Sequence, residues 1–150
     1  MRAVIQRVSE CSVIVDHQIV GSIREGFLIL LGVKKEDSEK EADKLSAKIA
    51  GLRIFTDEND KMNLALNDIG GGVLVVSNFT LYANCRKGRR PNFERAELPE
   101  RAEELYEYFC QAMQKNGIQK VEKGVFGGDM QVSLVNDGPV TIVIDSEELA

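Results

Sequence analysis

The chain has 150 residues, of which 43% are hydrophobic and 29% charged, a composition typical of a globular domain that buries its own core. Its formal net charge of −5 argues against a general, charge-driven affinity for nucleic acid. The longest nearly unbroken apolar run, Gly26 to Val33, is far shorter than the roughly 18 residues that a membrane-spanning helix needs. The N-terminal stretch alternates like a strand and lacks the continuous apolar segment of a signal peptide. We therefore expect one domain over residues 1–150, in the cytoplasm and without a membrane partner.

The first third of the chain has the pattern of antiparallel strands. Apolar and polar side chains alternate over residues 2–16, and Asp16-His17-Gln18 has the composition of a turn into the next strand. Residues 26–33 predict a buried strand. A helix is expected after it, because Ser38 and Glu41 have the spacing of a capping box. Four apolar residues at helical intervals support this helix: Ala42, Leu45, Ile49 and Leu52.

The rest of the chain predicts further strands around a second helix. Residues 53–66 indicate a short strand and an acidic turn, and residues 70–82 a second buried strand that runs directly into polar residues. A helix is expected from about residue 98, because Pro99 suits a first helical turn. The apolar face of this helix consists of Ala102, Leu105, Phe109 and Met113. With strands again from Ile118 onward, two helices and about seven strands predict a layered α+β domain.

Residues 130–134 and 141–145 both have strand character, and between them lies Asn136-Asp137-Gly138-Pro139. Asx and Gly residues are common in tight turns, so this tetrapeptide predicts a hairpin that reverses the chain. The proline is unusual there, because it enters the next strand without an N–H group to donate. From these residues alone, a plain turn and a functional Gly-Pro pair are both open.

Several common catalytic and metal-binding patterns are absent from the sequence. His17 is the only histidine, which excludes a histidine-based metal triad and weakens a Ser-His-Asp interpretation. The three cysteines, at positions 11, 85 and 110, form no metal-type pair and indicate reduced thiols. Gly70-Gly71-Gly72 precede a strand, whereas a phosphate-binding loop follows one. The acidic residues 57–61 lack the pattern of a calcium loop. We expect no metal site.

Residues 77–81, SNFTL, place hydroxyl groups at the end of an apolar strand, where a rigid scaffold can present polar groups to a ligand. Successive backbone N–H groups around Phe79 and Thr80 could hold an oxyanion. Thr80 alone is a poor nucleophile, because the sequence shows no base near it. A strand that ends in an ordinary loop accounts for the same residues, so both interpretations stay open here.

Arg86, Lys87, Arg89 and Arg90 concentrate positive charge in an otherwise acidic chain. A short run of this kind is either a solvated loop or a local contact for phosphate groups. Its position relative to a binding site decides between the two.

Four stretches together resemble the D-aminoacyl-tRNA deacylases, also called the D-tyrosyl-tRNA deacylase family. They are MRAVIQRVS at residues 1–9, GLRIFTDENDKMNLAL at 51–66, SNFTLYANCRKGRRPNF at 77–93 and FGGDMQVSLVNDGPVTIVID at 126–145. The resemblance covers the whole chain in order, without a large insertion. Its two specific motifs are the family's Ser-Gln-Phe-Thr-Leu and Asn-x-Gly-Pro-x-Thr runs.

The chain matches the second motif in full, with Asn136, Gly138, Pro139 and Thr141. It departs from the first at Asn78, where the family usually has Gln, so the amide is kept on a shorter arm. Gly127-Gly128 stands where Gly-Ala is more usual.

This resemblance implies an α+β fold of the layered α/β/β type, in which antiparallel and mixed sheets form a barrel-like core with two main helices packed outside. It implies a cytosolic homodimer, without metal or organic cofactor, that acts on the 3′ end of aminoacyl-tRNA and not on DNA. The reaction would cleave the ester between a D-amino acid or glycine and the terminal adenosine, and L-aminoacyl-tRNA would be rejected. The 2′-hydroxyl of the terminal ribose would help to orient or activate water.

The resemblance also assigns roles to the pair in the second motif. It implies that the Gly138-Pro139 bond is cis, that this pair reaches into the active site of the other subunit, and that Arg7 braces it. The two carbonyl groups of the pair would accept from the α-ammonium of the substrate and leave no space for an L side chain.

The facing wall of the site is expected to come from the first motif. Ser77, Phe79 and Thr80 would form this wall, with the oxyanion held by the backbone of Phe79 and Thr80. Further residues expected to bind the substrate or select its chirality are Asn78, Asn136 and Met130. Arg86, Lys87, Arg89 and Arg90 would bind phosphates of the tRNA acceptor end.

Two functions of other classes stay open at this stage. A non-catalytic module that binds RNA ends would protect D-aminoacyl-tRNA instead of hydrolysing it. A hydrolase of small D-amino-acid esters would act without tRNA.

Overall fold

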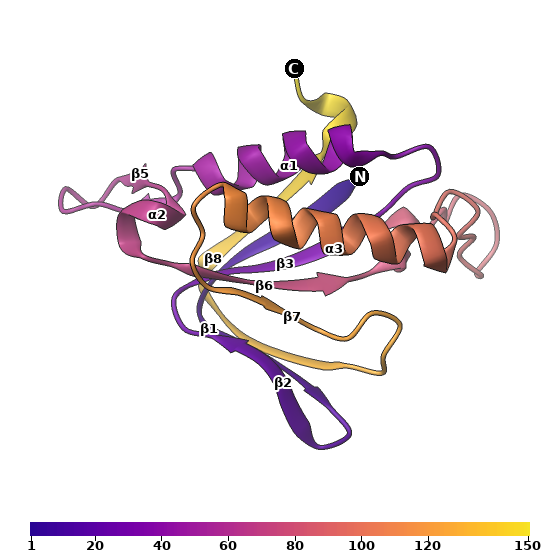
Figure 1. Ribbon diagram of the computed structural model, residues 1–150, viewed down its shortest axis with the longest axis horizontal. Coiled ribbons are helices and arrows are strands. Elements are labelled where there is room, and N and C mark those ends of the chain that lie inside the picture. The colour runs from indigo at the N-terminus through magenta and orange to yellow at the C-terminus, as the bar shows by residue number, and fades with distance from the viewer.

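The computed structural model describes the whole chain, residues 1–150. Its strands are β1 (Arg2–Val15), β2 (Gln18–Ile23), β3 (Gly26–Gly32), β4 (Phe55–Thr56), β5 (Met62–Leu64), β6 (Gly72–Ser77), β7 (Val121–Lys123) and β8 (Gln131–Asp145). Its helices are α1 (Glu39–Gly51), α2 (Leu66–Ile69) and α3 (Pro99–Lys115), with 3-10 turns η1 (Phe79–Tyr82) and η2 (Ser146–Glu148). Figure 1 shows α1 and α3 next to each other over one face of the main sheet.

The main sheet is mixed and depends on the long strand β1. The strands follow the order β2-β1-β3-β6-β7, and β8 pairs with the other side of β1. The first half of β1 lies between β3 and β8, and its second half lies between β2 and β8. β3 with β6 and β6 with β7 are parallel pairs, whereas all pairs of β1 are antiparallel.

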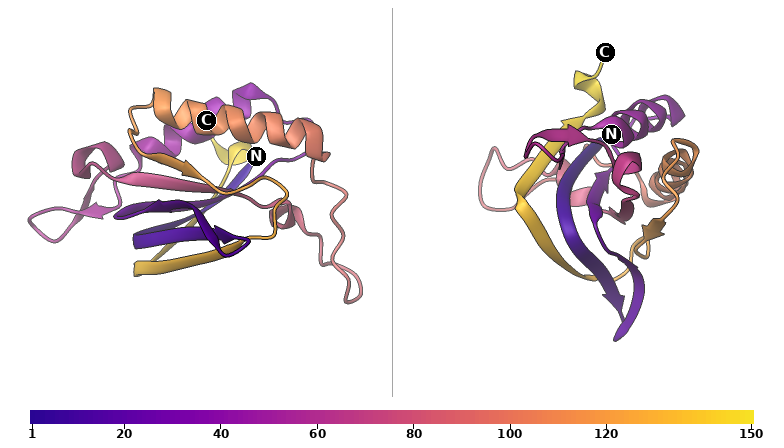
Figure 2. Two further views of the ribbon diagram at one scale, coloured as in Figure 1. Left: turned by 60° about the horizontal axis from the view of Figure 1, so that its bottom comes forward. Right: turned by 90° about the vertical axis from the view of Figure 1, so that its left-hand side faces the viewer.

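The sheet curls until β2 lies against β7, which Figure 2 shows as a curved set of strands beneath the helices. A Cβ atom at Gly21 of β2 would lie 2.6 Å from the carbonyl oxygen of Lys123 in β7, so only glycine allows this approach. The N–H of Ser22 also bonds to the Glu122 carboxylate, at 3.3 Å. The sheet is thereby nearly closed into a barrel-like core with helices outside, and the expected fold class is confirmed.

Alternate side chains of the central strands enter two separate apolar clusters, as the two-residue period of a strand requires. On the helix side, Phe27, Ile29, Val73 and Val75 pack with residues of α1 and α3. On the other side, Leu28, Leu74 and Val76 fill the barrel interior together with Val8, Cys11, Val13 and Ile23. The unbroken apolar runs of β3 and β6 follow from this burial on both faces.

Both main helices form where the sequence predicts them. Ser38 caps α1, with its hydroxyl accepting from the Lys40 N–H at 3.3 Å and its own N–H donating to Glu41 at 2.6 Å. The Ser38 hydroxyl also donates to the Glu41 carboxylate and lowers its pKa below the usual range. Pro99 begins α3. The predicted apolar faces are buried at Ala42, Leu45, Ile49, Ala102, Leu105, Phe109 and Met113.

The predicted hairpin at residues 136–139 is wrong. The chain does not reverse there, because residues 131–145 form the single strand β8, antiparallel to β1 over its whole length. Gln6 pairs with Thr141 and Val8 pairs with Asn136, so one residue of β1, Arg7, stands opposite four residues of β8. The tetrapeptide is therefore part of a large bulge in β8. Sequence composition cannot distinguish a turn from a bulge, because both need Asx and Gly residues.

Two shorter elements also differ from the expected pattern. The second buried strand ends at Ser77, and Phe79–Tyr82 form the 3-10 turn η1. The four-residue helix α2 was not predicted, and Gly70, with φ of 64°, ends it. No helix of the structure is both long and apolar enough to span a membrane.

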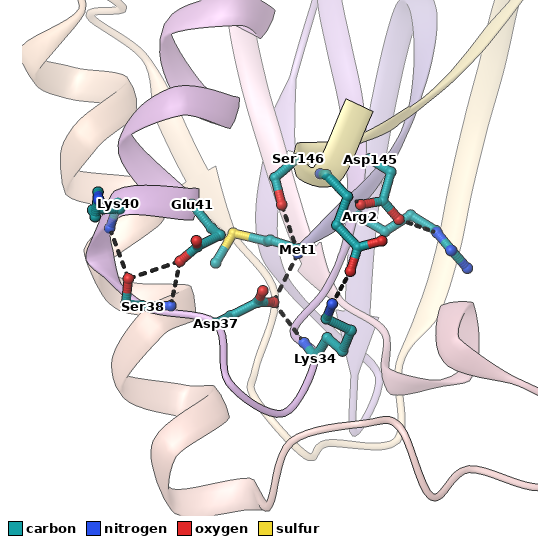
Figure 3. A network of polar contacts seen from close by, with 10 residues as sticks. Met1, Arg2, Lys34, Asp37, Ser38, Lys40, Glu41, Asp145 and Ser146 are labelled. Atoms are coloured by element: carbon teal, nitrogen blue, oxygen red, sulfur yellow. Dashed lines mark hydrogen bonds and ion pairs between the residues drawn. The ribbon is translucent and has the colours of Figure 1, made fainter. Parts of the chain in front are cut away.

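A buried polar network joins the start of β1 to the end of β8 and to the loop before α1 (Figure 3). The ammonium group of Met1 lies 2.8 Å from Asp37 and donates to the Ser146 hydroxyl at 2.9 Å. Asp37 also accepts the Lys34 N–H at 2.7 Å, and Arg2 pairs with Asp145 at 3.0 Å. This network holds the segment that follows β3 in place.

Candidate active site

The main candidate site is a cavity of about 500 Å³ at the C-terminal end of β6. Three segments of the chain form its walls: Ser77–Phe79, residues 93–102 with Phe93 at their start, and residues 126–130. Tyr106 of α3 also lines it and is fixed by a 2.8 Å hydrogen bond from its hydroxyl to the Val75 carbonyl. Ten of the sixteen lining residues are hydrophobic, so the cavity suits a flat apolar group that carries a few polar atoms.

Asn78 organises the turn at the end of β6. Its N–H donates to the Leu31 carbonyl at 2.8 Å, which keeps it in register with β3. Its side-chain oxygen accepts the Thr80 N–H at 3.1 Å and also the Thr80 hydroxyl. Of the two N–H groups expected to hold an oxyanion, that of Thr80 is thus engaged within the turn. Since the Thr80 hydroxyl donates to an amide oxygen, no base withdraws its proton.

Aromatic rings at the mouth of the cavity provide flat apolar surfaces. Phe79 is 58% exposed and meets Phe93 edge to face, with the ring centroids 5.1 Å apart. Phe126 lines the same cavity and lies 5.9 Å from the Tyr106 ring. Phe93, Tyr106 and Phe126 were not among the residues predicted for the site. They were missed because they lie far from SNFTL in the sequence. Aromatic residues on either side of the basic loop were a sequence signal that could have identified Phe93.

Met130 lies between the cavity and the barrel interior. It lines the cavity and also a second hollow of about 470 Å³, which opens toward the interior between Leu30 and Val132. Ser77 and Asn78 border both hollows as well. The two hollows therefore share wall residues at the end of β6.

The bulge of β8 is closed by the side chain of Asn136. This amide accepts the Val140 N–H at 2.9 Å and donates to the Val140 carbonyl at 3.1 Å, in place of a strand partner. Gly138 and Pro139 lie exposed at the tip, joined by a cis peptide bond. A Cβ atom at Gly138 would lie 2.3 Å from the Val140 backbone nitrogen, so the bulge excludes any larger residue there.

Arg7 fills the space opposite the bulge. It is 8% exposed, and its Nε donates to the Asp137 carbonyl at 2.8 Å while Nη1 donates to the Ile54 carbonyl at 2.7 Å. The Asp137 carboxylate is 3.8 Å away. Arg7 therefore fixes the bulge to the loop before β4, through a carbonyl of Ile54 that no sequence pattern indicated.

Within one chain, the bulge does not meet the cavity. Arg7 is in register with Phe27 and Val73, whereas Ser77 is in register with Leu31, four residues further along. At about 3.3 Å per residue, this is roughly 13 Å along the sheet. Two strands, β1 and β3, also separate β8 from β6. Gly138 and Pro139 line neither of the two hollows.

The basic segment projects from the edge of the cavity. Arg86, Lys87, Arg89 and Arg90 are exposed and form no ion pair, and the loop is closed by pairing of Asn84 with Asn92. Figure 2 shows this loop extending away from the body of the protein near the N-terminal end of α3. It leads directly to Phe93 and the cavity wall, so the four cations lie beside the site.

No strongly activated acid, base or metal site is present. No group of three or more His, Cys, Asp and Glu residues is placed to hold a metal ion, and His17 is exposed in the turn between β1 and β2. Burial raises the pKa of Cys11 and of Cys110 to about 12, so both thiols are protonated at neutral pH. Burial also raises the pKa values of Tyr82 and Tyr106. Hydrolysis here would depend on hydrogen bonding and positioning.

Comparison with known proteins identifies the family. The family model described as D-Tyr-tRNA(Tyr) deacylase matches residues 4–145. The chain belongs to this deacylase family. It is 57% identical over 148 residues to the D-aminoacyl-tRNA deacylase of Koribacter versatilis, with 99% of each chain covered. It is equally identical over 148 residues to that of Thermus aquaticus, with 99% of this chain and 97% of the relative covered. These enzymes hydrolyse esters, so the deacylase family and the enzyme class expected from the motifs are confirmed.

Two solved structures resemble this deacylase over nearly the whole chain. One, titled c-Myc DNA Unwinding Element Binding Protein, is 39% identical with a TM-score of 0.91, and the match covers 97% of this chain and 98% of the other. The second, titled as a probable eukaryotic D-amino acid tRNA deacylase, is 16% identical with a TM-score of 0.80 and covers 95% and 97%. The second match supports the fold alone.

Gly138→Ala tests the role of the bulge. We expect this variant to lose most of its deacylase activity, because the added Cβ cannot fit 2.3 Å from the Val140 nitrogen and the tip must move. The exposed tip adds little to the core, so thermal unfolding should change little. Gly51→Ala is the matched control, because Gly51 is an exposed glycine at the end of α1 where an added Cβ would meet nothing within 4 Å. Unchanged activity in Gly138→Ala would contradict a role for the bulge.

Proposed function

We propose that this deacylase hydrolyses the ester between a D-amino acid, or glycine, and the 3′-terminal adenosine of tRNA, and that it leaves L-aminoacyl-tRNA intact. The observation that carries the proposal is the cavity itself. Its walls are built by Ser77–Phe79 and residues 126–130, and these belong to the two stretches with the strongest resemblance to the family.

The cavity has the chemistry to take the terminal adenosine. Its aromatic rings, Phe79, Phe93 and Phe126, offer flat surfaces for a purine base, and most of its other lining is aliphatic. The adjoining hollow around Met130 would then receive the ester and the amino acid. The scissile carbonyl would lie near the end of β6, at the boundary between the two hollows.

Ester hydrolysis at this position needs a water molecule and an oxyanion site. Water adds to the ester carbonyl carbon, the oxyanion of the tetrahedral intermediate accepts from backbone N–H groups around Phe79, and the ribose 3′-oxygen leaves with a proton. The 2′-hydroxyl of the substrate can orient the water, which agrees with a site that holds no histidine. For Thr80 to contribute its N–H, the bond to Asn78 must be shared or exchanged.

Selection against L-amino acids is assigned to Gly138 and Pro139 of a second subunit. Their exposed bulge, held by Arg7 and Asn136, lies far from the cavity of its own chain, so it can reach only the cavity of another copy. The outer edge of β8 is unpaired and carries Val135 and Val143, 51% and 62% exposed. An unpaired edge with exposed apolar residues supports a homodimer.

The remaining features fit the same function. Arg86, Lys87, Arg89 and Arg90 are proposed to bind phosphates of the acceptor end, beside the cavity that holds the terminal nucleotide. The protein would act as a single domain in the cytoplasm, as a proofreading enzyme, with neither a cofactor nor a DNA partner. A module that only binds RNA ends, or a hydrolase of free D-amino-acid esters, is less well supported by a cavity and a basic loop next to each other.

Hydrolysis of matched D- and L-tyrosyl-tRNA by the purified protein, with a metal chelator present, tests the function directly. We expect release of D-tyrosine from tRNA and persistence of the L-ester, because the mechanism depends on hydrogen bonding and shape. Protection of D-tyrosyl-tRNA from spontaneous hydrolysis would instead identify a binding module. Equal rates on free D-tyrosine methyl ester would identify a general esterase.

Subunit mixing tests the shared site. Phe79→Ala alters the cavity and Gly138→Ala alters the bulge, so each pure variant is expected to be nearly inactive. A mixed dimer contains one pocket with both parts intact, and random exchange should therefore restore about a quarter of the wild-type activity. Mixing each variant with itself under the same conditions is the control. No recovery in a verified mixed dimer would exclude the cross-subunit arrangement.

Thr80→Ala separates the hydroxyl group from the backbone. We expect activity to fall but to persist, because the backbone N–H groups remain, and each oxyanion donor in a comparable site contributes about 2.7–4 kcal/mol. Single-turnover rates on D-tyrosyl-tRNA measure the effect, with Thr56→Ala as a control at an exposed threonine of β4. Complete loss in a folded protein that still binds tRNA would indicate a chemical role for the hydroxyl.

Replacing Arg86, Lys87, Arg89 and Arg90 together by Gln tests the loop. Affinity for tRNA should fall and its dependence on salt should flatten, whereas turnover at saturating substrate should change less, since phosphate contacts position the substrate. Filter binding over a range of salt concentrations provides both quantities. Unchanged affinity and slope would mean that the loop is only solvated.

A further inference from the structure

We propose that Lys35 and Arg95 bind a backbone phosphate of the single-stranded 3′ end, immediately before the nucleotide that occupies the main cavity. This deepens the proposed function and rests on it. The two residues belong to a charged hollow that is separate from the projecting loop of Arg86–Arg90.

The hollow lies where two distant segments run side by side. Lys34 and Ala96 form an antiparallel bridge, the Lys35 N–H donates to the Arg95 carbonyl at 2.9 Å, and the Glu97 N–H donates to the Val33 carbonyl at 3.0 Å. Residues 33–35 and 95–97 therefore form a short two-stranded wall. The buried network around Met1 and Asp37 holds one side of this wall, because Asp37 accepts the Lys34 N–H.

The two sides of this wall differ in chemistry. Val33, Ala96 and Glu97 line the main cavity. Lys34, Lys35 and Arg95 line a different hollow of about 530 Å³, which has no hydrophobic residue. This wall alone separates the main cavity, which suits a nucleotide base, from the hollow of Lys35 and Arg95, which suits a charged group. A nucleic acid strand whose last base enters the cavity can thus lay its preceding phosphate over the wall.

Lys35 and Arg95 are available for such a contact. Lys34 is committed to an ion pair with Glu147, whereas neither Lys35 nor Arg95 pairs with a carboxylate. The Arg95 guanidinium lies over the ring of Tyr82, 5.4 Å from its centroid, which orients the group while leaving it exposed. An oriented guanidinium beside a free ammonium suits the oxygens of a phosphodiester.

The distribution of charge favours an RNA strand as the occupant. Residues 34–36 and 84–97 contain seven cations and three carboxylates, within a chain of net charge −5. These residues therefore carry a net charge of +4, whereas the rest of the chain carries −9, so the excess of positive charge lies at the rim of the cavity. A single strand that leaves the cavity would meet these cations one after another.

Two carboxylates in the same hollow allow a test in which removing a charge should strengthen phosphate binding instead of weakening it. Glu36 and Glu94 line it with the cations and form no ion pair of their own. A phosphate in the hollow would be repelled by Glu94, so neutralising this residue should strengthen binding. Neutralising Lys35 or Arg95 should weaken it.

The experiment compares two variants that each lose two positive charges. Lys35→Gln/Arg95→Gln alters the hollow, and Arg24→Gln/Lys48→Gln is the matched control. Arg24 is 92% exposed with one 3.9 Å contact to an exposed Glu10, and Lys48 is exposed without an ion pair near the C-terminal end of α1. Both control residues lie away from the hollow. Arg24 precedes β3 whereas Lys34 follows it, and Lys48 lies in the last turn of α1, at the end of the helix away from Lys35. Glu94→Gln is the third variant.

Each protein is assayed on D-tyrosyl-tRNA and on D-tyrosyl-adenosine, which carries no phosphate. For Lys35→Gln/Arg95→Gln we expect KM on D-tyrosyl-tRNA to rise about fivefold for each lost contact, with kcat little changed. The salt dependence of binding to uncharged tRNA should flatten by about 0.7 in log–log slope for the one phosphate released. KM on D-tyrosyl-adenosine should not change. Glu94→Gln should lower KM on D-tyrosyl-tRNA, and the control variant should match the wild type.

The outcomes separate this inference from the proposed function. If the wild type hydrolyses neither substrate, the proposed function fails and the inference fails with it. If the wild type is active but the hollow variant behaves like the control, or if KM rises equally on both substrates, only the inference is overturned. Should the double variant not fold by circular dichroism, Glu94→Gln decides, because an unchanged or higher KM on tRNA contradicts a phosphate in the hollow.

Discussion

The pairing of β8 with β1 is the constraint on which the rest of the molecule depends. β1 pairs with β8 from Arg2 to Ile14. Near each end of this ladder β1 contributes buried apolar side chains to a core cluster, Ala3 and Ile5 at one end and Val13 at the other. Between the pairs Gln6–Thr141 and Val8–Asn136, β8 has four residues and β1 has one. The three additional residues of β8 must therefore leave the sheet at this point. A buried arginine stands at this point, and its two bonds to backbone carbonyls hold the expelled segment in one conformation.

The same constraint separates the β8 bulge from the cavity at the end of β6. The cavity forms at the end of β6, where β3 and β6 leave the parallel ladder and Asn78 starts the turn η1. The bulge forms on the opposite edge of the sheet, beyond β1 and β3. The rigidity of a sheet buried on both faces prevents them from approaching each other. In the proposed function, symmetry between two copies joins what one chain keeps apart.

The cavity and its rim differ in chemistry. The cavity is apolar and lacks activated acids, bases and metal ligands, while cations are gathered along its rim on residues 34–35 and 86–95. An acidic protein with one basic edge repels most of a nucleic acid and attracts one end of it. In the proposed function, the catalytic demands on the protein are modest: backbone donors, an oriented substrate and a chain that places the strand end over the cavity.

The sequence by itself determined the two main helices, the buried strands and the family, because these depend on local signals. The Ser38–Glu41 capping box, Pro99 at a helix start and the apolar runs of β3 and β6 each act within a few residues. The SNFTL and NDGPVT motifs identified the family for the same reason. Only the tertiary structure decided that residues 136–139 bulge from one strand instead of turning the chain, because β1 pairs with both flanks. It also decided that Ile54 anchors Arg7, that Phe93 and Phe126 join the cavity, and that Lys35 lies beside Arg95. These contacts join residues far apart in the chain, and a sheet's register and curl, which no local pattern contains, bring them together.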